Sequence, residues 1–142
     1  MRNKSGRLDK WYNADLLNGW NQYSTTEFAP PSYMASKEGV VYLRGIASAP
    51  GAPDHATAPI MRLPPGYRPD YTLVLHAWSA LLSSSNTSIV VVGGNTVSGS
   101  NTSGVAYKAG DIVFTGAGII GASPTLIWNV SYPIGKEKLK LL

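Results

Sequence analysis

The clearest pattern in this chain is an alternation of residues at every second position, which is typical of β-strands. The alternation runs through residues 40–47. It returns in residues 125–132, where Trp128, Val130 and Tyr132 fall on one face of the expected strand. We expect this aromatic face to lie in the core.

Several further segments combine β-forming residues with flanking Gly, Pro, Asn or Ser, and no segment shows the pattern of a long helix. The expected strands are residues 33–37, 40–47, 58–63, 71–80, 88–92, 105–108, 112–115 and 125–132. Residues 89–92 hold four β-formers in succession, which favours burial on both faces. About eight short antiparallel strands predict an all-β fold, a jelly-roll-like β-sandwich.

The N-terminal segment shows a different spacing. Leu8, Tyr12 and Leu16 recur every four residues, and Asn18–Gly19 is typical of a helix end. We therefore expect a short helix or a coiled neck before the sandwich. The length of 142 residues is that of one domain. The expected division is a neck over residues 1–20, a sandwich head domain over residues 21–135 and a basic tail over residues 136–142.

Two turns punctuate the expected strands. Lys37–Gly39 predicts a tight hairpin turn. In Leu63–Pro69 three prolines fix φ at about −65° and remove N–H donors, so this segment is neither helix nor central strand. We expect the Arg68 guanidinium to bind backbone carbonyls of this rigid turn rather than a ligand.

The strand Gly39–Gly45 (GVVYLRG) and the turn Leu63–Pro69 (LPPGYRP) resemble the head domains of bacteriophage tail fibres and receptor-binding proteins. Further matching positions are Trp20, Tyr33 and Val130–Pro133. The resemblance covers most of residues 20–133. The chain departs from the family pattern in residues 79–104, which are longer and richer in Ser, Thr and Asn.

The resemblance implies a viral protein of the virion tail that acts at the host cell surface. It implies a homotrimer that contacts other virion tail proteins and recognises a host cell-surface saccharide for adsorption. The alternative is a virion structural trimer, a fibre cap or decoration module without a receptor site. A depolymerase is a third class.

The net charge of +4 is concentrated at the two ends of the chain. Residues 1–10 carry four basic groups and one acidic group, and residues 136–142 carry three and one. A groove for phosphates needs clustered Lys and Arg on the folded surface, so we expect no nucleic-acid binding. The sequence has no apolar run of about 18 residues, and we expect no membrane insertion.

Residues 71–134 hold only two charged residues, Lys108 and Asp111. An uncharged polar surface is desolvated at lower cost than a charged one, which suits a subunit interface or a neutral sugar. Trp78 and Tyr107 border its Ser-, Thr- and Asn-rich part, residues 79–104, and either could instead be a core residue. The predicted ligand-binding residues are Trp78, Tyr107, His76 and Asn101.

Motifs for catalysis, cofactors and metals are weak. Gly116–Gly121 matches G-x-G-x-x-G, but a proline and a strand follow where a dinucleotide fold needs a helix. The two histidines are not at metal-ligand spacing, and His76 is expected in the interior or, in a trimer, near the threefold axis with an ion. The carboxylates are isolated in sequence. We expect a binding protein with no enzymatic activity, no cofactor and no metal.

Overall fold

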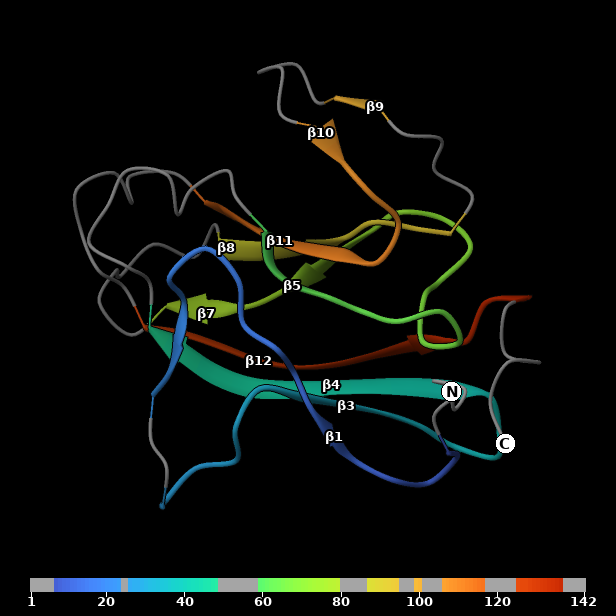
Figure 1. The fold of residues 1–142 in the computed structure, drawn as a ribbon, viewed down its shortest axis with the longest axis horizontal. Helices are drawn as coiled ribbons and strands as arrows, with labels where there is room; N and C mark the ends of the chain where they lie inside the picture. Colours follow the sequence, from blue (N-terminus) through green and yellow to red (C-terminus); the bar gives the residue numbers. More distant parts are fainter. Residues whose placement is uncertain are drawn as a thin grey trace, which may run out of the picture.

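The structure is a computed structural model that describes residues 7–23, 26–48, 59–79, 87–94, 99–100, 106–116 and 125–136. Within these ranges every named element is a β-strand, and all strand pairs are antiparallel. The predicted all-β sandwich is confirmed. Figure 1 shows the two main sheets one above the other. The specific connectivity of a jelly roll stays a prediction.

The larger sheet has six strands, in the order β1-β3-β4-β12-β7, with β2 also paired to β4. Its strands are β1 (Tyr12–Asn13), β2 (Asn21–Gln22), β3 (Ser32–Ala35), β4 (Val40–Ser48), β7 (Trp78–Ser79) and β12 (Thr125–Pro133). The long strands β4 and β12 pair along their whole length. The expected turn at Lys37–Gly39 joins β3 to β4, with Gly39 at a φ of 88° that favours glycine.

The smaller sheet has four strands, in the order β5-β11-β8-β6. They are β5 (Pro59–Arg62), β6 (Leu73–His76), β8 (Thr87–Val91) and β11 (Asp111–Gly116). A separate ribbon pairs β9 (Gly99–Ser100) with β10 (Ala106–Tyr107). Each of the eight predicted strands has a counterpart, but the segment expected as one strand over residues 71–80 is two, β6 and β7.

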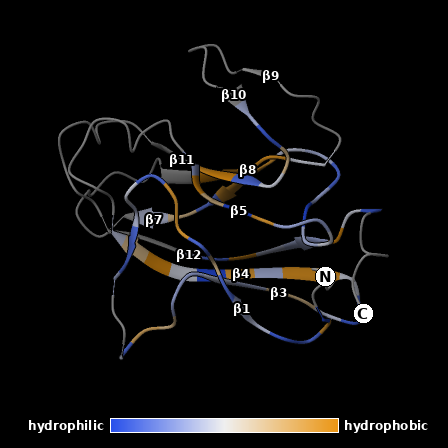
Figure 2. Cartoon of the chain, in the orientation of Figure 1, coloured by the Kyte–Doolittle hydropathy of each residue, from blue (hydrophilic) through white to orange (hydrophobic). Residues whose placement is uncertain are grey.

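The core lies between the two sheets. Figure 2 shows hydrophobic residues along β4 and along β8 and β11 of the facing sheet. Val41 and Leu43 of β4 have no exposed surface, and neither do Ile89 and Ile112 of the facing strands. The alternation in the sequence therefore separates core from surface as predicted.

The predicted burial of the aromatic face of residues 125–132 holds where side chains are described, and the predicted burial of residues 89–92 on both faces holds except at Val90. Trp128 and Tyr132 are 2% and 3% exposed, so the aromatic face of β12 is in the core. Ile89 and Val91 are fully buried and Val92 is nearly so, while Val90 is half-buried.

The helix or coiled neck expected around Leu8 to Trp20 is wrong for the described part of that segment. Residues 7–23 contain no helix, and β1 pairs with β3 inside the larger sheet. Trp20 is 3% exposed in the core. The apolar residues at spacing four pack from an extended chain onto the sandwich, because tertiary contacts outweigh a weak helical preference.

Candidate ligand-binding site

The proline-rich turn Leu63–Pro69 is fixed to the core by its own side chains. Arg68 donates from Nε to the carbonyl oxygen of Leu63 at 2.9 Å, so its expected role in holding the turn is confirmed. Tyr67 is 1% exposed, and the hydroxyl of Tyr132 donates to the Tyr67 carbonyl oxygen at 2.6 Å. The turn therefore delivers the chain to β6 in a fixed position.

Three tyrosine rings pack together at this turn. The ring centre of Tyr33 lies 4.7 Å from that of Tyr67 at an interplanar angle of 69°, and Tyr12 stacks on Tyr33 at 5.9 Å. Burial raises the pKa of Tyr33, and the charge of Asp15 and the nearby Tyr12 raise it further. Burial also raises the pKa of Tyr67, with smaller contributions from Tyr12 and Tyr33. The raised pKa values keep the hydroxyls of Tyr33 and Tyr67 protonated at neutral pH, and the cluster serves packing.

The chain beyond the turn carries the most exposed large hydrophobic side chains of the described residues. Tyr71 is 74% exposed, Val74 is 68% exposed and Trp78 is 56% exposed. β6 is an end strand of the smaller sheet and β7 an end strand of the larger one, and the chain passes between them at the buried Ala77. Residues 71–78 thus form a rim along one open side of the sandwich, called the 71–78 rim below.

Two of the predicted ligand-binding residues, His76 and Trp78, lie on this rim, and both are exposed. The interior positions considered for them are therefore wrong. Tyr107 is half-buried on β10, in the ribbon that Figure 1 shows away from β7. Asn101 lies outside the described residues. The structure brings His76 and Trp78 together and does not join Tyr107 to them.

The chain segment that begins with the rim, residues 71–134, holds only two charged residues, Lys108 and Asp111. Asp111 is fully buried, and its two carboxylate oxygens accept hydrogen bonds from Nε of Arg62 and from the backbone N–H of Lys108. This carboxylate therefore stabilises the smaller sheet and is not offered to a ligand. In the described part of the chain, no group of three or more His, Cys, Asp or Glu residues is placed to hold a metal ion.

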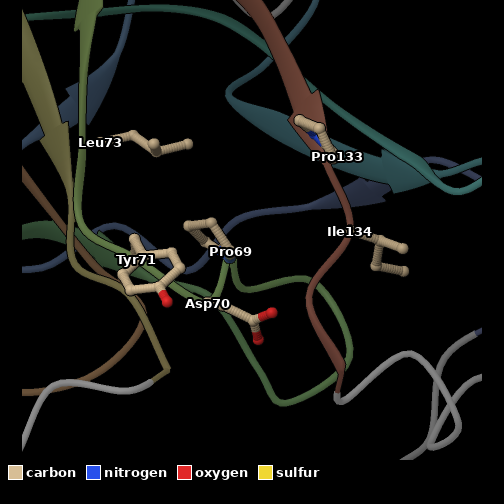
Figure 3. A pocket seen from close by; sticks show the side chains of 6 residues that line it. All are labelled: Pro69, Asp70, Tyr71, Leu73, Pro133 and Ile134. Carbon is tan, nitrogen blue, oxygen red and sulfur yellow. The ribbon is translucent and has the colours of Figure 1, made fainter.

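A pocket of about 190 Å³ opens beside the first residues of the rim. Its lining residues are Pro69, Asp70, Tyr71, Leu73, Pro133 and Ile134. Figure 3 shows Pro133 and Ile134 at the end of β12, across the pocket from Tyr71 and Leu73. The pocket was not predicted from the sequence, because its two walls are far apart along the chain. The only local signal was an aromatic residue, Tyr71, directly after Pro69-Asp70.

Comparison with family models, curated proteins and solved structures finds no match for this chain. Among the residues that the structure describes, there is no helix long and apolar enough to cross a membrane.

Proposed function

We propose that this β-sandwich is the head domain of a phage tail fibre or a related receptor-binding protein. It binds a host cell-surface saccharide during adsorption, without catalysis and without a cofactor. The resemblance of Gly39–Gly45 and Leu63–Pro69 to that family supports the proposal. The observation that carries it is the 71–78 rim, where the most exposed large hydrophobic side chains of the described residues follow one another.

The chemistry of the rim favours a sugar. The face of an aromatic ring accepts the C–H groups of a pyranose, while hydroxyl groups need hydrogen-bonding partners close by. Tyr71 and Trp78 offer two such rings, each more than half exposed. Residues 71–78 contain no Asp, Glu, Lys or Arg, so desolvating the rim itself costs less than desolvating a charged surface. An uncharged saccharide fits this surface better than a nucleic acid does.

The rim also supports assembly as a homotrimer within the virion tail. β6 pairs with β8 on one side only among the described strands, and an uncovered end strand is a surface for another chain. Val74, which is 68% exposed, offers no hydrogen bond to a sugar and suits contact with a second copy. This aliphatic residue is also the observation that favours the second candidate function, a virion structural trimer without a receptor site.

Binding of fluorescently labelled protein to a panel of bacterial strains, measured by flow cytometry, tests the proposal. We expect the protein to coat a subset of strains. Mild periodate oxidation, which cleaves vicinal diols of sugars, should remove the signal, whereas protease treatment of the cells should not. If no strain is coated, receptor binding is contradicted and the virion structural trimer is the better account. If coating survives periodate but not protease, the receptor is a protein and not a saccharide.

A further inference from the structure

The pocket beside the 71–78 rim is held open by a rigid frame. The carbonyl oxygen of Pro69 accepts a hydrogen bond from the backbone N–H of Gly94 at 2.7 Å, and the hydroxyl of Thr72 accepts one from Gly93 at 3.1 Å. On the other side, Gly135 donates to the carbonyl oxygen of Arg68 at 3.1 Å. The loop that bears the pocket is thus bound both to the end of β8 and to the end of β12.

Two glycines make this close fit possible. A Cβ at Gly93 would lie 2.3 Å from the backbone carbon of Tyr71, and a Cβ at Gly135 would lie 2.5 Å from the carbonyl oxygen of Arg68. No side chain fits at such distances. Because the backbone is packed this tightly and Pro69 fixes its own φ, little conformational entropy is lost when a ligand binds. The pocket is preformed.

The lining combines apolar walls with one acceptor group. The ring of Tyr71 is 74% exposed beside the aliphatic side chain of Leu73. Asp70 accepts the backbone N–H of Lys136 through Oδ1 at 2.9 Å. A carboxylate has about four acceptor sites, so Asp70 retains the capacity to accept hydroxyl groups. Figure 3 shows Asp70 and Tyr71 next to each other at the pocket.

These features select one kind of ligand. An apolar face and several hydroxyl donors on one small ring are the properties of a pyranose, whereas a phosphate or an acidic sugar would be repelled by Asp70. A cationic group is served less well, because the lining offers a single carboxylate, which already accepts the Lys136 backbone N–H, and a single aromatic ring rather than a cage of rings. The volume of about 190 Å³ is below the roughly 300–1,000 Å³ of typical ligand pockets, which fits a single ring.

We propose that this pocket binds one uncharged pyranose ring, with its C–H face on Tyr71 and a hydroxyl group donating to Asp70. The inference rests on the proposed function, since it assigns the saccharide site of the same binding protein. It adds a residue, Asp70, and a wall, Pro133–Ile134, that the exposed rim does not contain.

The test is titration of the full chain with the methyl glycosides of glucose, galactose, mannose and N-acetylglucosamine, followed by amide chemical shifts. At about 100 mM, far above a millimolar Kd, we expect at least one glycoside to shift the amides of residues 70–73 and 135–136 in a saturable way. Tyr71→Ala should weaken binding about tenfold, through loss of the ring contact. Tyr71 is exposed, so this variant should fold normally.

Two further variants separate ligand contact from structure. Asp70→Asn keeps an oxygen for the Lys136 N–H but replaces an acceptor in the pocket by an amide donor, and should also weaken binding about tenfold. Tyr23→Ala removes an exposed tyrosine elsewhere, which is 52% exposed, and should leave the affinity unchanged.

Three outcomes would overturn the inference. If a glycoside shifts other amides and Tyr71→Ala binds it normally, the pocket is not the site, although the protein remains a saccharide binder. If tetramethylammonium shifts the pocket amides and the glycosides do not, the site is for cations. If no glycoside binds, the pocket assignment fails, and the loss or survival of cell coating after periodate then decides the proposed function separately.

Discussion

Tyr67 both stabilises and destabilises the folded protein, through different parts of its side chain. Its ring is 1% exposed against Tyr12 and Tyr33, and its carbonyl oxygen accepts the hydroxyl of Tyr132. Its own hydroxyl is buried without a hydrogen-bond partner among the described residues. A buried polar group in this condition lowers stability by about 1–3 kcal/mol. The ring therefore stabilises the turn while the hydroxyl opposes it.

Two matched substitutions test this balance. Tyr67→Phe should raise the free energy of unfolding by about 1 kcal/mol, because it removes the unpaired hydroxyl and keeps the ring. Tyr132→Phe removes a hydroxyl that donates a hydrogen bond, and should lower it by about 1–3 kcal/mol. Urea denaturation measures both values. A loss of stability in Tyr67→Phe equal to that in Tyr132→Phe would show that the Tyr67 hydroxyl is paired.

The buried tyrosines also predict the response to alkaline pH. Burial raises the pKa of Tyr132 and of Tyr67 above the ordinary value near 10. The folded state then holds these protons after the unfolded state has released them, so stability is fully present below pH 10 and falls above it. Each group contributes a slope of up to about 1.4 kcal/mol per pH unit. Tyr67→Phe should reduce the slope between pH 10 and 12 in urea denaturation, whereas an unchanged slope would contradict the assignment.

At the scale of elements, the strands with a period of two were predictable because their pattern is local. β4 and β12 could be placed almost to the residue, since each is nine residues long and alternates between core and surface. The two-residue strands β1 and β2 could not, because so short a strand is defined by its partner and not by its own sequence. The break between β6 and β7 also depends on tertiary structure, since Ala77 marks the passage from one sheet to the other.

The candidate site was predicted in part. An uncharged region with exposed aromatic groups was expected, and His76 and Trp78 lie there. Whether Trp78 and Tyr107 lie in one site could not be predicted from the sequence, because it depends on the position of the β9–β10 ribbon relative to the two sheets. The pocket could not be predicted from the sequence either, because Asp70 and Ile134 are far apart along the chain and come together only in the folded protein.

The turn Leu63–Pro69 is predicted to act in stability and not directly in binding. Arg68→Ala removes the hydrogen bond to the Leu63 carbonyl oxygen and should lower the free energy of unfolding by about 1–3 kcal/mol. Lys37→Ala is a matched control, because the Lys37 ammonium forms only a surface ion pair with Asp9 at 4.0 Å and should cost less than about 1 kcal/mol. Normal melting of Arg68→Ala together with lost cell coating would instead assign Arg68 to the binding site.

At the scale of the whole molecule, firm attachment to a cell requires several saccharide sites in one assembly, because each site alone binds weakly. A single shallow site with one ring and a few acceptors should bind free sugar with a Kd of about 1 mM, or roughly −4 kcal/mol. Three such sites on one rigid head raise the effective strength by factors of about 10² to 10⁴ where receptor spacing allows. Each single site then releases its sugar readily, while the virion as a whole stays attached to the cell.

Light scattering tests the assembly. We expect a mass of about 45 kDa at micromolar concentration, three times the 15.1 kDa of the chain, with thermal unfolding that depends on protein concentration. Val74→Lys places a charge on the exposed edge strand and should shift the mass towards 15.1 kDa, while Tyr23→Lys should not. A wild-type monomer under these conditions would contradict the trimer.

The most direct test of saccharide recognition by the 71–78 rim is an array of bacterial surface polysaccharides probed with three proteins in parallel. These are the wild type, the rim variant Tyr71→Ala/Trp78→Ala, and the control Tyr23→Ala/Phe28→Ala, which removes two exposed aromatic rings 5.8 Å apart elsewhere on the molecule. We predict that the wild type and the control bind the same few polysaccharides and that the rim variant, folded by its melting curve, binds none. Equal binding by all three proteins, or no binding by the wild type, would contradict the account.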